Sequence, residues 1–430
     1  MTYTKIIFIM TQIISGKNSY MKEILFLFIL YLTLIISFFF GENSTGGAII
    51  DYNNQQSISK KFSENFLSTL LSFDSFNTRH SPVLIIFLSL FEKINLPDLL
   101  IRLIHLHICL LLPIFFYKCL ILKFNHTDKR ILFLLSALIF LSPTFRSLAI
   151  WPDSRLLGLV LFTLSVFYFL KFDASKNFSY AMYNIFTLAL SAYVSPNFSV
   201  FSIFFMIKFI FHYSFLSKKI LSLILLNLFL ALPAFYYIFI LDINFFLKSA
   251  IGIKGDESII FHNLFNDILI TFSLIFFYLI PFVSLKIIKL DNFLNLKNLT
   301  ITILIFLVCF LNFDYNYAYS GGGIFFKLSN FIFNNNYLFY IISFFSILIM
   351  CALLMENYYN VLLFALIILN NPQYTIYHKY FDPFLLIVFF TIFSLKIDLK
   401  RISKMKNYLF IFAYFLVFLI ISNLKLTLVN

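Results

Sequence analysis

Long apolar runs with almost no charge inside them recur along this chain, and they constrain its fold more than any other feature. The run Glu23 to Phe40 has one charged residue in eighteen positions, and similar runs follow as far as Leu424. Only 12% of the 430 residues are charged and 61% are hydrophobic, which leaves too little charge to cover the surface of a soluble domain. About 20 apolar residues in a helix cross the hydrocarbon core of a bilayer. The sequence therefore predicts an all-α polytopic membrane protein surrounded by membrane lipid.

The lengths of the runs and the positions of the basic loops predict about thirteen transmembrane helices. Lys5, Lys17 and Lys22 surround the start of the chain, which predicts a cytoplasmic N-terminus. The run Val83 to Phe91 would be roughly 14 Å long as a helix, so we expect it to lie at the outer surface without spanning. This choice places the basic cluster Lys118 to Arg130 in the cytoplasm. The predicted spans are Glu23–Phe40, Leu99–Tyr117, Ile131–Leu141, Leu156–Leu170, Tyr180–Val194, Phe198–Tyr213, Ile220–Leu241, Ile268–Leu285, Leu299–Phe313, Tyr337–Met355, Val361–Leu369, Phe384–Leu395 and Tyr408–Leu424.

The chain is predicted to form a single membrane-embedded domain over residues 1–430, since neither a repeat nor a linker is visible. Residues 41–98 form a long outer loop, in which Lys60 to Phe73 shows the apolar spacing of an interfacial amphipathic helix. Met21 begins a Met-Lys-Glu start, so residues 1–20 are an N-terminal extension if translation begins there. We expect an integral protein of the bacterial inner (cytoplasmic) membrane.

The net charge and the cysteines argue against two other classes of protein. A formal charge of +13 is explained by the enrichment of Lys and Arg in cytoplasmic loops, so no nucleic-acid partner is expected. The four cysteines, at positions 109, 119, 309 and 351, lie in or beside apolar runs without CxxC spacing. Neither a disulfide framework nor a metal site is predicted. No cofactor is certain, although a divalent cation stays open.

Irregular polar sequence is concentrated on the predicted outer side. The short basic connections on the other side contain no P-loop and no GxGxxG, so a nucleotide site is not expected. The stretch Ser320 to Gly323 lacks a following Lys-Ser/Thr and is interpreted as a flexible outer loop. Chemistry is therefore expected on the outer face. The outer patches are residues 41–82, 142–155 and 242–267, and the late loops 314–336 and 370–383.

Asp51 is the candidate catalytic residue, because it follows the first span closely and has apolar neighbours. A carboxylate in such surroundings can keep a raised pKa and serve as a base. Judged by its spacing alone, Asp51 is better interpreted as a loop aspartate that caps a turn beginning at Asn53. Its neighbour Tyr52 is a further outer-face candidate.

Cations at the outer mouths of the predicted spans are candidates for binding a phosphate. Arginine offers a bidentate fork that suits phosphate oxygens. The alternative is internal pairing, since Asp98 lies four residues before Arg102, and Asp153 lies between Arg146 and Arg155. The candidate cations are Arg79, His80, Arg102, Arg146, Arg155 and, from the late loop, Lys379; Asp153 and His378 are further outer-face candidates.

The order of these patches resembles the GT-C superfamily of membrane glycosyltransferases, which includes protein O-mannosyltransferases and the aminoarabinose transferase of lipid A. The matching stretches are Asp51-Tyr52, the segment from Arg79-His80-Ser81-Pro82 to Phe91, Leu99-Leu-Ile-Arg102-Leu, and Lys118. Leu141-Ser-Pro143 with Trp151-Pro-Asp153-Ser, and Tyr377-His-Lys-Tyr-Phe-Asp-Pro383, are similar to later elements of such families. One departure is that Tyr52 follows Asp51 where many relatives carry a second acidic residue.

The resemblance implies a function and assigns roles. Asp51 would take a proton from an acceptor hydroxyl, which then attacks the anomeric carbon of a sugar carried on a polyprenyl phosphate, with inversion. The outer cations would hold the lipid phosphate that leaves. The acceptor would be a glycan, a lipid or a protein. Two alternatives stay open: a flippase or transporter for lipid-linked sugars, and an enzyme of the O-antigen polymerase or ligase type.

Overall fold

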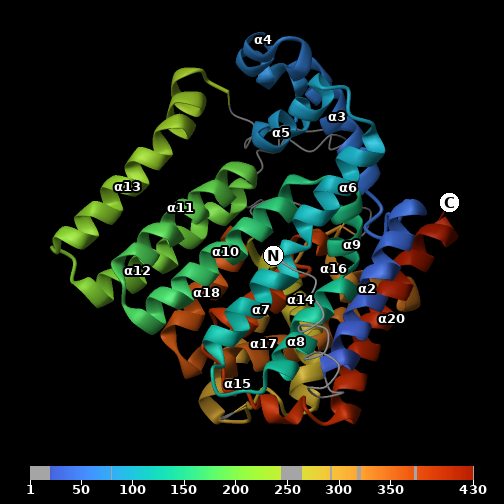
Figure 1. The fold of residues 1–430 in the computed structure, drawn as a ribbon. Helices are drawn as coiled ribbons and strands as arrows, with labels where there is room; N and C mark the ends of the chain where they lie inside the picture. The colour runs from blue at the N-terminus through green and yellow to red at the C-terminus, as the bar shows by residue number, and fades with distance from the viewer. Residues whose placement is uncertain are drawn as a thin grey trace, which may run out of the picture.

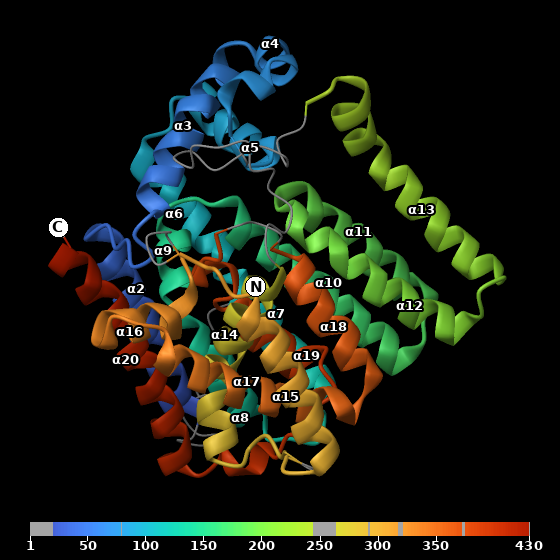
Figure 2. The same ribbon diagram turned by 180° about the vertical axis from the view of Figure 1, so that it is seen from behind.

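The structure, a computed structural model, describes residues 20–78, 80–243, 264–290, 293–316, 321–371 and 375–429. In these ranges the regular elements are helices, and one isolated bridge pairs Ile288 with Ile397. Figures 1 and 2 show a bundle of helices with α3, α4 and α5 lying across one end. The helices are α2 (Tyr20–Phe39), α3 (Ala48–Glu64), α4 (Phe66–Leu71), η1 (Phe73–Phe76), α5 (Pro82–Lys93), α6 (Asp98–Cys109), α7 (Leu111–Lys123), α8 (Lys129–Ala137), η2 (Leu138–Leu141), α9 (Pro143–Ile150), α10 (Ser154–Ser175), α11 (Phe178–Val194), η3 (Pro196–Phe201), α12 (Ser202–Tyr213), α13 (Lys218–Phe235), η4 (Tyr236–Ile240), α14 (Leu264–Ser284), α15 (Leu296–Leu311), α16 (Gly323–Phe333), α17 (Tyr337–Glu356), α18 (Tyr358–Leu369), η6 (His378–Tyr380), α19 (Phe384–Thr391), η7 (Leu399–Arg401) and α20 (Met405–Val429).

The helices agree with an all-α membrane protein, but thirteen spans are not confirmed. A helical segment overlaps each predicted span. In the described part of the chain, however, six helices are long and apolar enough to cross a membrane. The count becomes seven if the pair Lys129–Leu141 and Pro143–Ile150, which is bent by 64°, forms one span. The six are Asp98–Lys123, Ser154–Ser175, Lys218–Ile240, Leu264–Ser284, Tyr337–Glu356 and Met405–Leu424.

The predicted outer loop is mostly helical. Helix α3 packs on α5, and α5 has 12 residues, so its length of about 18 Å is less than the thickness of a hydrocarbon core. The apolar side chains of Leu84, Ile85 and Leu88 are buried, which explains why this run does not need lipid. Ser81 begins α5 by accepting a hydrogen bond from the Val83 amide, and Pro82 follows it in the first turn.

Basic loops meet at the end of the bundle opposite α3 to α5. The Lys289 amide donates to the Lys396 carbonyl oxygen at 3.0 Å, and the Asp398 amide donates to the Ile287 carbonyl oxygen at 2.7 Å. The Tyr408 hydroxyl donates to the Leu134 carbonyl oxygen of α8, which joins the start of α20 to this end. The lower part of Figure 1 shows these turns close together. Two loops that the sequence predicts on the same side are thus in direct contact.

Helix α10 packs closely against the junction of α11 and η3. Gly158 of α10 lies so near Ser195 that an added Cβ would come 2.5 Å from the serine Cβ. The Ser191 hydroxyl donates to the Gly158 carbonyl oxygen at 2.8 Å across the same contact. Phe162 then stacks on Phe198 with centroids 5.0 Å apart. This packing fixes the position of the first turn of α10, where several polar residues lie.

Candidate functional site

Three polar segments that are far apart in the sequence meet at the end of the bundle under α3. The Lys379 ammonium lies 2.8 Å from the Asp51 carboxylate. Ser142 donates to Asp382 at 2.6 Å, and Arg146 pairs with Glu42 at 2.9 Å. The sequence separations are 328, 240 and 104 residues. The patches predicted around residues 41–52, 142–155 and 377–383 therefore form one polar cluster.

The Asp51–Lys379 pair is the accessible part of this cluster. Asp51 lies in the first turn of α3, where the helix dipole favours a carboxylate. The side chain of Asp51 is 28% exposed and that of Lys379 is 19% exposed. Lys379 bonds one carboxylate oxygen, Oδ2, and the other oxygen has no hydrogen bond within the described structure. Burial lowers the pKa of Lys379, but the negative charges of Asp51, Tyr380 and Asp153 raise it more, so the ammonium stays protonated.

Arg155 lies beside this pair. Its guanidinium stacks over the Tyr380 ring at 3.6 Å and donates one hydrogen bond to the Asn371 side-chain oxygen at 3.0 Å. Asp153 caps α10 by accepting from the Arg155 amide at 2.7 Å, so it orients the backbone. A guanidinium held by a ring face and one hydrogen bond keeps N–H donors for another acceptor.

Tyr52, next to Asp51 in the sequence, and Arg102 both lie against the Trp151 ring. The Tyr52 hydroxyl donates to Asp98, and its ring lies 6.0 Å from Trp151. Burial and this hydrogen bond to Asp98 raise the pKa of Tyr52 well above its usual value, so it stays neutral. Arg102 lies 4.0 Å from the Trp151 ring and 5.0 Å from the Phe38 ring, with Asp98 at 3.8 Å. The predicted internal pairing of Arg102 with Asp98 is therefore present.

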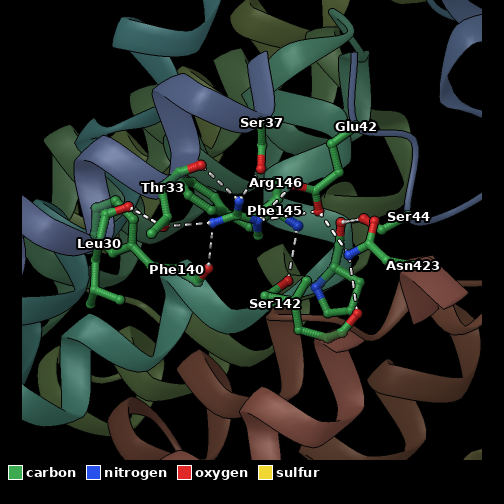
Figure 3. A network of polar contacts seen from close by, with 12 residues as sticks. Leu30, Thr33, Ser37, Glu42, Ser44, Phe140, Ser142, Phe145, Arg146 and Asn423 are labelled. Atoms are coloured by element: carbon green, nitrogen blue, oxygen red, sulfur yellow. Dashed lines mark hydrogen bonds and ion pairs between the residues drawn. The ribbon is translucent and has the colours of Figure 1, made fainter. Parts of the chain in front are cut away.

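The environment of Arg146 argues against its predicted role in binding a phosphate. Figure 3 shows its guanidinium enclosed by α2, the following loop and η2. The Nε–H donates to Glu42, and the two terminal nitrogens donate to Thr33, Ser37 and the Phe140 carbonyl oxygen. Because every N–H already has a protein acceptor, this arginine has none left for a phosphate. Its role is to hold the end of the first helix.

Asp382 and His378 form the inner part of the cluster. Asp382 is buried and accepts from the Ser142 hydroxyl and from the Thr144 amide at 3.0 Å. The His378 ring shares a hydrogen bond of 2.9 Å with the Tyr278 hydroxyl. Burial lowers the pKa of His378 to about 4, although Asp382 acts in the opposite direction. His378 itself is half-buried, and its place among the outer-face candidates stays a prediction.

The remaining candidates are only partly placed. Arg79 lies outside the described residues. His80 is half-buried, and its ring nitrogen Nδ1 lies 3.3 Å from the Ser154 hydroxyl, beside the start of α10. It is therefore near Asp153 and Arg155 in the same turn. No group of three or more His, Cys, Asp or Glu side chains in the described ranges is arranged to hold a metal ion.

Sequence reasoning missed Glu42, Ser142, Asp382 and Asn371 as individual residues. Glu42 comes two residues after the end of the first apolar run, and a carboxylate that is buried there needs a partner. Asp382 stands immediately before Pro383 in a stretch that the sequence had singled out. Nothing in the spacing pairs either residue with its partner. Comparison of the chain with protein-family models, with curated proteins and with solved structures finds no match.

Proposed function

We propose that this protein is a membrane glycosyltransferase that moves a sugar from a polyprenyl phosphate to an acceptor hydroxyl at the outer face, with inversion. The observation that supports the proposal is the part-exposed Asp51–Lys379 pair with Arg155 beside it. A base and cations for an anionic leaving group are what this reaction needs in one place. The acceptor is a glycan, a lipid or a protein.

The proposed reaction is a single displacement. The acceptor oxygen transfers its proton to the open oxygen of Asp51 and forms a bond to the anomeric carbon. The bond from that carbon to the phosphate oxygen breaks, and its electron pair leaves on the polyprenyl phosphate. Lys379 and Arg155 stabilise the charge on that phosphate, where the low dielectric of a membrane surface strengthens the attraction.

Lys379 serves both partners in this scheme. While it pairs with Asp51, Lys379 orients the carboxylate through one of its two oxygens, Oδ2. When a donor phosphate approaches, the ammonium can bond both anions, because it has three N–H donors. Arg155 supplies the planar fork on the other side of the phosphate.

The test is transfer from radiolabelled polyprenyl-phosphate sugars by the purified protein. Asp51→Asn should lower turnover by roughly 10² to 10⁴-fold, because the amide cannot accept the proton. Glu64→Gln, which removes an exposed carboxylate from the same helix, is the matched control. Equal turnover in the two variants would remove Asp51 from the mechanism.

The same assay separates the alternatives. Movement of intact lipid-linked sugar across vesicles containing the protein, with the sugar–phosphate bond unbroken, would replace the transferase by a flippase. Transfer only from polyprenyl-diphosphate glycans would favour a polymerase or ligase. A sugar released from polyprenyl phosphate onto a hydroxyl supports the proposal.

A further inference from the structure

Five lysines gather at the end of α10 that lies farthest from Arg155. They are Lys123 at the end of α7, Lys171 and Lys176 at the end of α10, Lys208 in α12 and Lys219 at the start of α13. We call them the lysine cluster. Arg155 and Lys176 are separated by 21 residues of helix, or roughly 30 Å, so the cluster is independent of the proposed catalytic site.

Aromatic rings lie beneath four of the five ammonium groups. Nζ of Lys208 is 3.1 Å from the centroid of the Tyr359 ring, and Nζ of Lys219 is 4.6 Å from that of Tyr213. For Lys171 over Tyr180 the distance is 5.1 Å, and for Lys176 over Phe172 it is 5.6 Å. Cation–π contacts of this kind restrict long, flexible side chains to particular directions.

The cluster holds more positive than negative charge. Asp173 forms an ion pair with Lys176 at 2.6 Å. Lys208 interacts electrostatically with the like charges of Lys123 and Lys176 as well as with Asp173. Five lysines and one aspartate give a net charge of +4 (5 − 1), and in the described part of the chain the other four lysines form no ion pair. Like charges held close together repel one another, and an anion bound between them would lower that repulsion.

We propose that the lysine cluster binds the phosphate of an anionic phospholipid headgroup. Tyr168, Tyr180, Tyr213 and Tyr359 surround the lysines, and tyrosines at the ends of apolar helices are typical of the level at which headgroups lie. Lipid phosphate is the anion available at that level, and each lysine near the surface attracts it. The long apolar stems of the lysines suit the boundary between lipid chain and headgroup.

The experiment titrates phosphatidylglycerol and phosphatidylcholine into the full chain in detergent and measures bound lipid by native mass spectrometry. The variant Lys123→Gln/Lys208→Gln/Lys219→Gln removes three unpaired charges. The control Lys289→Gln/Lys400→Gln/Lys404→Gln removes the same charge from the basic loops beside α14 and α20. Thermal unfolding of each variant reports whether it folds. If the cluster variant unfolds, the exposed single variant Lys219→Gln takes its place.

The wild-type chain and the control should bind phosphatidylglycerol at least about 10-fold more tightly than phosphatidylcholine. The cluster variant should lose this preference, and Lys219→Gln should weaken it several-fold. Equal loss in cluster and control variants would overturn the proposal in favour of general positive charge. Inorganic phosphate that displaces the lipid at equal concentration would overturn it in favour of a soluble anion. A preference unchanged in the cluster variant would place the lipid elsewhere.

Discussion

Arg146 and Arg155 belong to the same polar patch but differ in how many of their N–H donors are already bonded to the protein. Arg146 is buried with all its N–H groups bonded to the protein. Arg155 is half-buried and has one bond from its guanidinium to a side chain. Arg155 therefore keeps N–H donors for a phosphate and Arg146 does not, so Arg155 is the better candidate.

The Glu42–Arg146 pair should be a large single contribution to stability. Both side chains are 6% exposed. Glu42→Gln keeps the shape but leaves a buried guanidinium without its counter-charge, so we expect the free energy of unfolding to fall by about 3–5 kcal/mol. Denaturation of the purified protein measures this loss. Glu64→Gln, at an exposed position, should change stability by less than about 0.5 kcal/mol. A Glu42→Gln variant as stable as that control would contradict this prediction, because it would show that water solvates the Arg146 guanidinium.

His378 should make stability depend on pH. Its pKa is about 4 in the folded protein and about 6.5 when exposed, so the unfolded chain binds the extra proton between these values. Stability should be constant with respect to this group above pH 6.5 and should fall as the pH drops from 6.5 to 4. The midpoint of thermal unfolding across that range measures it. His378→Gln should flatten the slope, and an unchanged slope would assign the dependence to other groups.

At the scale of elements, α9 begins where two distant segments bond. Ser142 caps the helix by accepting a hydrogen bond from the Phe145 amide at 2.9 Å, and its hydroxyl donates a hydrogen bond to Asp382. Asp382 also accepts the Thr144 amide, so the carboxylate from the late loop completes the N-terminus of α9. The bend of 64° between η2 and α9 lies at this point.

Removal of this cap should uncouple the two segments. Ser142→Ala loses the bond that the hydroxyl accepts from the Phe145 amide and the bond that it donates to Asp382, which should lower stability by roughly 1–2 kcal/mol. Asp382→Asn should cost more than Ser142→Ala, because the charged acceptor of two donors is lost. Thermal unfolding measures both. Ser217→Ala at the exposed start of α13, which removes a cap without a distant partner, is the control and should cost less than Asp382→Asn.

At the scale of the whole molecule, polar and basic segments lie at opposite ends of the bundle. Asp51, Arg155 and Lys379 lie at one end, and the loops around Lys289 and Lys396 meet at the other. Alternation of basic loops along the sequence predicts the same division. We infer that the basic end faces the cytoplasm.

Reporter fusions test this division. A fusion at Asn95, directly after α5, should report the outer side, because α5 is too short to cross. A fusion at Asn125, after α7, should report the cytoplasm. If Asn95 reports the cytoplasm, α5 crosses the membrane and the outer position of Asp51 is wrong.

How much the sequence predicts depends on whether a feature is local. Helical segments and the pairing of Arg102 with Asp98 follow from apolar runs and from four-residue spacing. The pairs Asp51–Lys379 and Ser142–Asp382 join segments separated by hundreds of residues, and spacing says nothing about them. The enclosure of Arg146 depends on how closely α2 packs against it, and the pattern of residue types along the sequence does not reveal that packing. The number of spans was also not settled by the pattern, since several of the helices are short.

Helix α19 has a consequence for how the chain is assembled. It has eight residues, all buried, and packs against α7, α10 and α14. A helix of roughly 12 Å cannot enter a bilayer as an independent segment. Helices α7, α10 and α14 all precede α19 in the chain, so they are synthesised before it. We therefore expect α19 to reach its place by docking onto these earlier helices, and a C-terminal fragment that begins at α19 should stay a substrate for membrane proteases until they are supplied.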